Sequence, residues 1–181
     1  MSKIGTKVPS ATFRVRVRDE SIGGDNPFRW QDMSTEDFFD NKRVVVFSLP
    51  GAYTPTCSTY QLPGFENNAQ AFKDKGIDDI YCISVNDSFV MNKWAKDQGI
   101  ENVKVIPDGN GEFTSELDML SMFTARGFGL RSWRYAMVVD NGVITHFFQE
   151  PGRMDPIVDN DPDRDMDPYS VTAPEHILNN I

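Results

Sequence analysis

Cysteine and histidine are scarce in this chain. Cys57 and Cys82 are the only cysteines among 181 residues, and two histidines accompany them. Two cysteines are too few for a disulfide framework, and they form neither a C-x-x-C pair nor a cluster with histidine of the kind that binds zinc. The sequence therefore predicts no metal and no bound cofactor, and it is compatible with a reactive thiol in a reducing compartment.

Long hydrophobic runs and an excess of positive charge are also missing. No apolar stretch approaches the length that spans a bilayer, and residues 1–7 lack the apolar core of a secretory signal. The net charge of −9 repels nucleic acid and anionic membranes at long range. We therefore expect a cytoplasmic protein with small polar or neutral substrates, and neither nucleic acid nor a membrane as partner.

The chain has the size and composition of one globular domain, residues 1–181, because 39% hydrophobic residues can bury a substantial core. Its first part predicts a β-hairpin. Apolar and basic residues alternate over residues 11–18, a turn follows at 23–27, and Phe28 and Trp30 suit a returning strand. Ser34 and the next three residues then give a helix-start signal for a short helix through Phe39.

The middle of the chain alternates strands and helices. Residues 44–49 form a continuous apolar run that predicts a central strand covered on both faces. A helix over 65–75, a strand over 80–85, a helix over 87–98 and a short strand over 103–106 follow. This alternation predicts an α/β fold in which these strands pair in parallel.

The last part predicts antiparallel pairing. After a turn at 107–111, a helix is expected over 113–122, followed by a glycine-rich loop. Strands at 133–139 and 143–148 then flank Asn141-Gly142, a dipeptide that suits a tight hairpin. The Asp- and Pro-rich residues 151–168 predict a solvated loop, in which the acidic residues 155–167 lack the spacing of a calcium-binding EF-hand. Residues 173–181 carry a weak helical pattern.

Cys57 is the candidate nucleophile. Residues 50–57 directly follow the predicted central strand and precede a helical stretch, so Cys57 should lie in or near the first helical turn. Free N–H groups and the positive end of the helix dipole favour an anion there, which stabilises the thiolate over the thiol. Thr54 can place its hydroxyl within reach, Pro50 would make the turn rigid, and Arg131 or Arg134 could supply fixed positive charge.

These residues resemble a known active site. The pattern Pro50-x-x-x-Thr54-x-x-Cys57 is similar to the active-site signature of peroxiredoxins. The runs 47–57 (FSLPGAYTPTC), 62–65 (LPGF), 84–87 (SVND) and 131–135 (RSWRY) extend the resemblance to the type II, or type-five, subfamily over roughly residues 8–150. The chain looks most like the peroxiredoxin half of bacterial peroxiredoxin-glutaredoxin fusions.

The resemblance implies a thioredoxin-like fold with an N-terminal extension, a central mixed β-sheet flanked by helices, and an antioxidant peroxidase. Cys57 would attack hydrogen peroxide or an organic hydroperoxide and become a sulfenic acid, while Thr54 and Arg134 orient and polarise the peroxide. Residue by residue, Pro50, Thr54, Cys57 and Arg134 take the family's site roles, which favours Arg134 over Arg131. The type-five relatives also imply a homodimer.

How the oxidised enzyme is reset depends on Cys82. Its apolar strand suggests an inert core residue, and a disulfide with Cys57 would require the two Cα atoms to lie within about 7 Å. We therefore expect one-cysteine catalysis, in which glutathione attacks the Cys57 sulfenic acid and glutaredoxin or a second thiol reduces the mixed disulfide. Glutathione would be a co-substrate, and this chain has no C-x-x-C glutaredoxin half.

Other functions stay open at this point. An internal Cys57–Cys82 disulfide could be reduced by thioredoxin, and a redox sensor would need one oxidation without turnover. A cysteine hydrolase would need a histidine base beside Cys57. The sequence places neither His146 nor His176 there.

Overall fold

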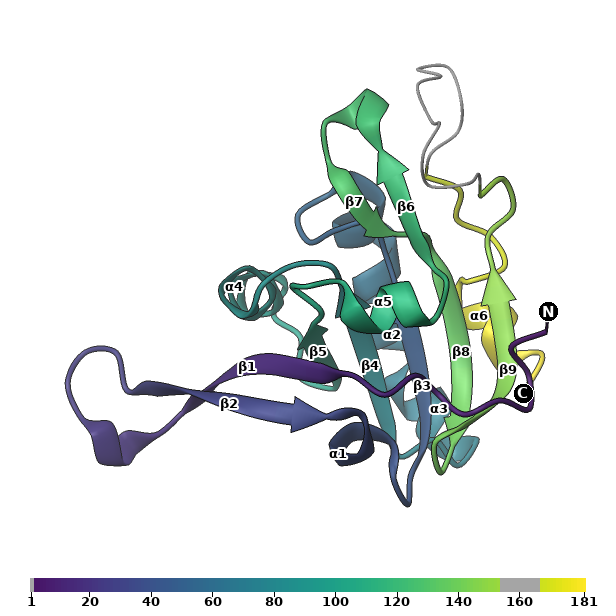
Figure 1. The fold of residues 1–181 in the computed structure, drawn as a ribbon. Coiled ribbons are helices and arrows are strands. Elements are labelled where there is room, and N and C mark those ends of the chain that lie inside the picture. The colour runs from purple at the N-terminus through teal and green to yellow at the C-terminus, as the bar shows by residue number, and fades with distance from the viewer. Residues whose placement is uncertain (1, 154–166) are drawn as a thin grey trace.

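A five-stranded mixed sheet forms the centre of the computed structural model, which describes residues 2–153 and 167–181 (Figure 1). The strand order is β5-β4-β3-β8-β9. Strands β3 (Arg43–Ser48), β4 (Asp79–Ser84) and β5 (Val103–Pro107) pair in parallel, whereas β8 (Tyr135–Asp140) and β9 (Val143–Gln149) are antiparallel to their neighbours. The mixed α/β sheet predicted from the sequence is confirmed.

The apolar run of β3 is buried on both faces, as its composition predicts. Val44, Val45, Val46 and Phe47 are all fully buried. Because successive side chains of a strand point to opposite faces, this run contributes to two separate hydrophobic clusters. Strand β3 therefore lies between the two hydrophobic clusters, one on each face of the sheet.

One face of the sheet is covered by helices alone, and the other by the N-terminal hairpin together with two short helices (Figure 1). Val45 and Phe47 share their cluster with residues from α2 (Leu62–Asn67), α3 (Ala69–Asp74), α4 (Ser88–Gln98) and α6 (Pro174–Leu178). Phe47 stacks on Phe65 of α2 with ring centroids 3.9 Å apart. Val44 and Val46 pack with residues from β1 (Thr12–Arg18), α1 (Thr35–Phe39) and α5 (Glu112–Glu116).

The N-terminal hairpin is confirmed. Strand β1 pairs antiparallel with β2 (Phe28–Ser34), and the hairpin, with a 3-10 turn (Glu20–Ile22) near its tip, projects beyond the central sheet (Figure 1). Phe13 and Val15 are buried, whereas the arginines that alternate with them are not. Ser34 caps α1 in a capping box with Asp37, which explains why the predicted helix begins at this point.

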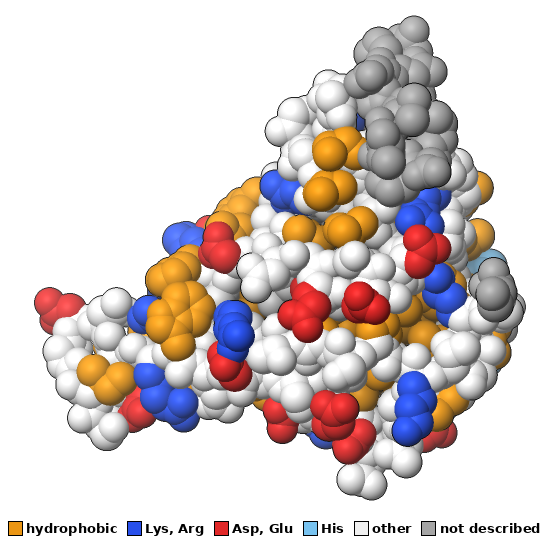
Figure 2. Space-filling model, in the orientation of Figure 1, with side chains coloured by type: hydrophobic (Ala, Val, Ile, Leu, Met, Phe, Trp, Pro, Cys, Tyr) orange, Lys and Arg blue, Asp and Glu red, His pale blue; other side chains and the backbone are white. Residues whose placement is uncertain are grey.

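The face of the molecule drawn in Figure 2 carries interspersed acidic and basic side chains, and hydrophobic side chains gather where the hairpin meets α4. Trp30 and Phe89 are more than half exposed, and their rings meet edge to face beneath the Arg16 guanidinium. Among the described residues, none of the helices is both long and apolar enough to cross a bilayer.

The second hairpin and the last helix also match the sequence. Asn141 and Gly142 join β8 to β9 and have φ values of 46° and 78°, the left-handed conformation that this dipeptide tolerates in a two-residue turn. Helix α6 falls within the weak helical pattern at 173–181. Residues 154–166, which carry most of the predicted solvated loop and of the acidic stretch, lie outside the described residues.

Two helix predictions are wrong in their bounds. The helix expected over 65–75 is two helices, α2 and α3, because Asn68 leaves the helical region with φ −96° and ψ 8°. Its side-chain Nδ2 donates to the Gly64 carbonyl, which satisfies the end of α2 locally. The helical stretch also starts earlier than residue 65, since it runs on from the turn that carries Cys57.

The helix expected over 113–122 ends at Glu116. Asp118 has a φ of 54°, and this left-handed residue turns the chain away from the helix axis. The following residues form β6 (Leu120–Phe123), which pairs antiparallel with β7 (Gly129–Ser132) across a 3-10 turn (Thr124–Arg126). The predicted glycine-rich loop therefore belongs to a hairpin, and Trp133 and Arg134 precede β8 rather than forming part of it.

Candidate active site

Cys57 lies at the start of a helix that follows β3. The helical conformation begins at Pro55, and residues Cys57–Gln61 form a π-helical turn in which the Leu62 N–H donates to the Cys57 carbonyl. Helix starts present backbone donors that have no partner within the helix. The predicted place of Cys57 in the first helical turn is therefore what the structure shows, and the π-helical turn is of a kind found often at functional sites.

The turn between β3 and this helix is held by several hydrogen bonds. Thr54 Oγ1 donates to the Gly51 carbonyl at 2.7 Å, and the Ala52 N–H donates to Asn86 Oδ1 at 3.0 Å. Asn86 Oδ1 also accepts from the Ser84 hydroxyl at the end of β4. Because the Thr54 hydroxyl proton is used, its oxygen retains lone pairs that can accept a hydrogen bond from a bound molecule.

Arg134 is the charged residue that contacts the sulfur of Cys57. Its side chain is 1% exposed, and Nη1 lies 3.7 Å from the fully buried Cys57 Sγ. Nη1 also donates to Gln61 Oε1, and Nη2 pairs with the Asp167 carboxylate. The guanidinium gives the buried sulfur a positively charged neighbour, and buried surroundings screen charges less than water does.

Arg131, the other candidate, binds to the turn between β3 and the helix that carries Cys57. Its Nη1 donates to the Pro50 carbonyl at 3.4 Å and its Nε donates to the Phe128 carbonyl at 3.2 Å. A Cβ atom on Gly51 would lie only 2.7 Å from Arg131 Nη1, so the end of the Arg131 side chain would have to shift to admit a larger residue at position 51. The geometry therefore brings Arg134, and not Arg131, to the sulfur.

A small pocket opens beside this constellation. It is lined by two prolines, two aromatic rings and three polar residues: Pro50, Thr54, Pro55, Phe123, Arg126, Phe128 and Asp167. Pro50 is buried and Thr54 is half-buried. The three residues that sequence reasoning placed around Cys57 are thus found together, Pro50 and Thr54 on the pocket wall and Arg134 at the sulfur.

Sequence reasoning missed three residues of the site. Gln61 lies four positions after Cys57, a spacing that places both side chains on one side of a helix and that could have revealed it. It links Arg134 to β3, since its Nε2 donates to the Ser48 carbonyl at 3.4 Å. Asp167 and the Tyr169 ring, which lies 5.6 Å from the Arg134 Cζ atom, come from the C-terminal part of the chain and had no local signal.

Cys82 is a buried strand residue. It lies on β4, is fully buried, and belongs to the same hydrophobic cluster as Cys57. Burial raises the pKa of the Cys82 thiol well above its ordinary value, and the neighbouring Cys57 adds to this effect. Both cysteines are present as free thiols. The thiol of Cys82 is therefore a poor nucleophile in this conformation.

The histidines have other partners. His146 stacks on Phe148 at 6.4 Å, and His176 meets the same ring edge to face at 5.7 Å. Both rings thus lie against Phe148, and neither is found in contact with Cys57 among the described residues. In the part of the chain that the structure describes, no group of three or more His, Cys, Asp or Glu side chains could hold a metal ion.

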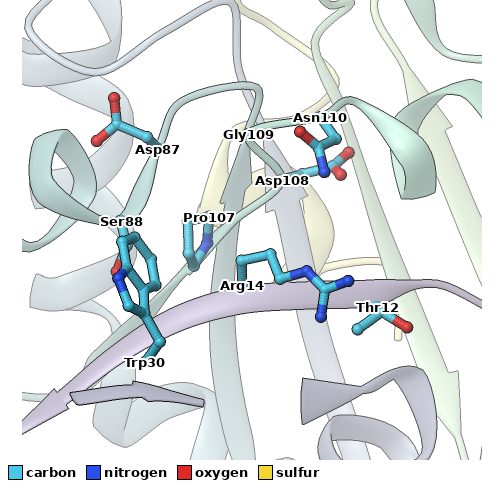
Figure 3. Close-up of a pocket in the computed structure, with 9 residues that line it drawn as sticks. All are labelled: Thr12, Arg14, Trp30, Asp87, Ser88, Pro107, Asp108, Gly109 and Asn110. Carbon is cyan, nitrogen blue, oxygen red and sulfur yellow. The ribbon is translucent and has the colours of Figure 1, made fainter. Parts of the chain in front are cut away.

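A second pocket lies between the N-terminal hairpin and the turn after β5 (Figure 3). Several of its polar groups are engaged in the fold. Asp108 accepts hydrogen bonds from the backbone and hydroxyl of Thr114, Ser88 Oγ accepts from the Arg16 N–H, and Arg14 pairs with Asp32. The pocket shares no lining residue with the cysteine site, and we interpret it as the seam that joins the hairpin to the sheet.

Comparison with known proteins agrees with the resemblance seen in the sequence. The profile of the Redoxin family matches residues 3–161. The chain is 58% identical to "Peroxiredoxin" of Rhizobium etli over 172 residues, which cover 95% of this chain and 92% of that protein. It is 49% identical to "Hybrid peroxiredoxin hyPrx5" of Haemophilus influenzae over 173 residues, with 95% of this chain and 67% of that protein covered.

A solved structure gives the same result. The structure of the Plasmodium falciparum antioxidant protein, a 1-Cys peroxiredoxin by its description, superposes with a TM-score of 0.84 at 32% identity and covers 97% of both chains. The thioredoxin-like architecture expected from the sequence is thereby confirmed along the length of the chain.

Proposed function

The chain belongs to the peroxiredoxin family of peroxidases, and from this premise we propose that Cys57 is the peroxide-reactive residue and that glutathione, glutaredoxin or both reset it. The observation that carries the proposal is the 3.7 Å contact between Arg134 Nη1 and the buried Cys57 Sγ at a helix start. A buried thiol that contacts a guanidinium has a polar partner, which packing alone would not require.

The first step is attack of the Cys57 thiolate on the terminal oxygen of the hydroperoxide. A sulfur–oxygen bond forms as the O–O bond breaks, Cys57 becomes a sulfenic acid, and the departing oxygen takes a proton and leaves as water or an alcohol. Arg134 donates to the peroxide and stabilises the developing negative charge. Thr54 accepts the peroxide hydrogen with the lone pairs that its bond to Gly51 leaves available.

The second step regenerates the thiol from outside the chain. A thiolate of glutathione attacks the Cys57 sulfenic acid, a mixed disulfide forms with loss of water, and glutaredoxin or a second thiol then releases Cys57. The state of Cys82 supports an external thiol, because this thiol is fully buried and burial raises its pKa. The Haemophilus influenzae relative is described as a hybrid, which is compatible with a glutaredoxin link.

The competing cycle is an internal disulfide between Cys57 and Cys82, reduced by thioredoxin. A strand thiol enclosed in the core would need local unwinding of the helix start before its sulfur could reach that of Cys57. We therefore propose the one-cysteine cycle.

The experiment compares wild type with Cys82→Ala. Each protein is given hydrogen peroxide and glutathione, and turnover is followed with glutaredoxin in one series and with thioredoxin in another. We expect equal turnover of the two proteins with glutaredoxin, and intact mass should show one glutathione on Cys57 when glutaredoxin is left out. Loss of turnover in Cys82→Ala, with activity of the wild type only in the thioredoxin series, would contradict the one-cysteine cycle.

We further propose that the protein acts as a homodimer. Three large hydrophobic side chains near the cysteine helix and the β6–β7 hairpin are about half exposed or more: Tyr53 at 52%, Tyr60 at 61% and Leu130 at 48%. A second copy of the chain would cover them. Sedimentation equilibrium should give twice the chain mass, and Tyr60→Glu should shift the equilibrium toward the monomer. A monomeric wild type would refute this proposal.

We also propose that residues 1–181 act as one catalytic domain, because α6 packs Ile177 into the cluster that contains Cys57. Its thiol co-substrate is abundant in a reducing compartment, so we place the activity in the cytoplasm.

A further inference from the structure

We propose that Asp167 and Tyr169 are positioning residues of the peroxidase, which hold the Arg134 guanidinium against Cys57. The inference rests on the proposed role of Arg134 and extends the site to residues 167–172, called the C-terminal segment below. None of the motifs around Cys57 includes this segment, which lies 33 or more residues after Arg134 in the chain.

The Arg134 side chain is held on several sides. Nη1 donates to Gln61, Nη2 donates to Asp167, and Cζ lies 5.6 Å from the centre of the Tyr169 ring. A planar guanidinium that is fixed through Nη2 and against a ring face has little freedom to rotate. Nη1 therefore stays directed at the Cys57 Sγ atom. Nε has no hydrogen-bond partner within the described parts of the chain, so Gln61, Asp167 and Tyr169 are the residues that restrain the guanidinium.

Glu150 fixes the C-terminal segment beside the start of β8, where Arg134 lies. Its fully buried carboxylate accepts four hydrogen bonds of 2.7 to 2.9 Å, from the N–H and hydroxyl of Ser170 and from those of Thr172. Its own N–H donates to the Arg134 carbonyl at 3.2 Å. One residue thus joins the backbone of Arg134 to the segment that holds its side chain.

The ionisation of Glu150 agrees with this role. Burial alone would raise the pKa of its carboxyl, but the hydrogen bonds from Ser170 and Thr172 outweigh burial and hold the pKa below its usual value. The carboxylate is therefore charged at neutral pH, and the attachment of the segment is complete under those conditions.

The segment is also packed against the helix region that carries Cys57. A Cβ atom on Gly64 of α2 would lie 3.5 Å from the Tyr169 hydroxyl and 3.3 Å from Pro174 Cγ. Burial raises the pKa of Tyr169 to about 12, so its ring stays uncharged at neutral pH. A neutral ring face attracts the guanidinium, whereas a phenolate would compete with the Cys57 thiolate for it.

The two residues contribute by different means, and each has a conservative variant that isolates the contribution. Asp167→Asn keeps an oxygen that can accept from Nη2, and Asp167→Ala removes it. Tyr169→Phe keeps the ring face, and Tyr169→Ala removes it. Positioning therefore predicts that the alanine variants are slow and that the conservative variants recover most of the rate.

The test is the second-order rate of Cys57 oxidation by hydrogen peroxide, measured by stopped-flow in the full chain. Asp167→Ala and Tyr169→Ala should lower the rate about 10- to 100-fold, the loss expected from a misplaced catalytic donor, whereas Asp167→Asn and Tyr169→Phe should stay within about threefold of wild type. Asp140→Asn, an exposed carboxylate at the opposite end of β8, is the matched control and should not change the rate.

A double-mutant cycle with Arg134→Met shows whether the effect passes through Arg134. Asp167→Ala should cause no further loss in the Arg134→Met background, because the group that it positions is already gone. Equal losses in both backgrounds would overturn the inference, as would an Asp167→Ala rate equal to or above that of wild type. If Arg134→Met itself oxidises at the wild-type rate, the proposed site fails, and not merely the positioning by the C-terminal segment.

Discussion

Replacement of Arg134 is the most informative perturbation of this site. Arg134→Met removes the positive charge and the donors but fills a similar volume, and Arg134→Lys keeps the charge without the planar fork. Two effects should appear in the methionine variant, because the guanidinium both stabilises the thiolate and donates to the reacting peroxide.

The magnitude follows from the geometry. Opposite unit charges at the 3.7 Å that separates Nη1 from Sγ attract each other by about 4.5 kcal/mol at an effective dielectric constant of about 20. The Asp167 carboxylate on Nη2 offsets part of this attraction at the sulfur. Loss of one preorganised donor to a developing anion costs about 10²- to 10³-fold in rate. We therefore expect a loss of that order for Arg134→Met, and a loss of about tenfold for Arg134→Lys.

The assay is stopped-flow oxidation by hydrogen peroxide with tryptophan fluorescence as the signal. Trp94 Nε1 donates to Ser58 Oγ at 3.0 Å, directly beside Cys57 in the sequence, so this ring should sense the change at sulfur. The rate is measured at neutral pH and at about pH 9.5, because ionisation of a thiol rises with pH. A defect that shrinks at the higher pH reports the loss of thiolate, and a defect of the same size at both pH values reports the loss of a donor to the peroxide.

Stability must be measured alongside the rate. Removal of the buried guanidinium breaks its bonds to Gln61 and Asp167, and we expect a loss of about 1–3 kcal/mol in the free energy of unfolding by urea. A protein that is folded at the assay temperature and oxidises within about threefold of wild type at both pH values would refute the role of Arg134.

Other variants test the remaining parts of the account. Thr54→Val should slow Cys57 oxidation about 10²-fold in the same stopped-flow assay, because the peroxide loses an acceptor, whereas Thr54→Ser should stay close to wild type. Cys82→Ala should lower the free energy of unfolding by about 1 kcal/mol in urea titrations, since the loss of a small core side chain leaves little space. Because the pKa of Glu150 is lowered on folding, its contribution to stability is complete above the unfolded value near 4.3 and is lost as pH falls through the folded value. Glu150→Gln should therefore flatten the dependence of melting temperature on pH below about 4.3.

Local signals predicted the framework of the site well. The apolar run of β3 and the Asn141-Gly142 turn each depend on neighbouring residues, and each was found where the sequence placed it. Cys57 lies in the first helical turn as expected, although the helical stretch begins well before the expected start at residue 65. These elements bring Cys57 to the end of the central strand. The resemblance to peroxiredoxins added Arg134, which no local pattern could have selected over Arg131.

Tertiary contacts overrode local preference elsewhere. Phe113, Leu117 and Leu120 have helical spacing, yet Asp118 adopts a left-handed conformation and Leu120 enters β6. The pairing of β6 with β7 determines that this segment is a strand. The spacing of hydrophobic residues within the segment does not reveal a pairing partner that lies several residues away. The helix likewise breaks at Asn68, whose side chain donates a hydrogen bond to the Gly64 carbonyl, and a helical pattern does not reveal this bond.

The outer part of the site was beyond sequence reasoning for a different reason. Asp167 and Tyr169 reach Arg134 in the fold, where Glu150 at the end of β9 binds the C-terminal segment. Their residue types are ordinary and their spacing has no period. Only the folded arrangement shows that a carboxylate and an aromatic ring flank the guanidinium.

The central claim is that peroxide oxidises Cys57 and that Cys82 takes no part. The direct measurement is intact mass and peptide mapping of the reduced protein after one equivalent of hydrogen peroxide, with Cys57→Ser as control. The account predicts a gain of one oxygen on the peptide that contains Cys57, a free thiol at Cys82, and no change in the control. An unoxidised wild type, or a loss of two hydrogens with both thiols consumed within one chain, would contradict it.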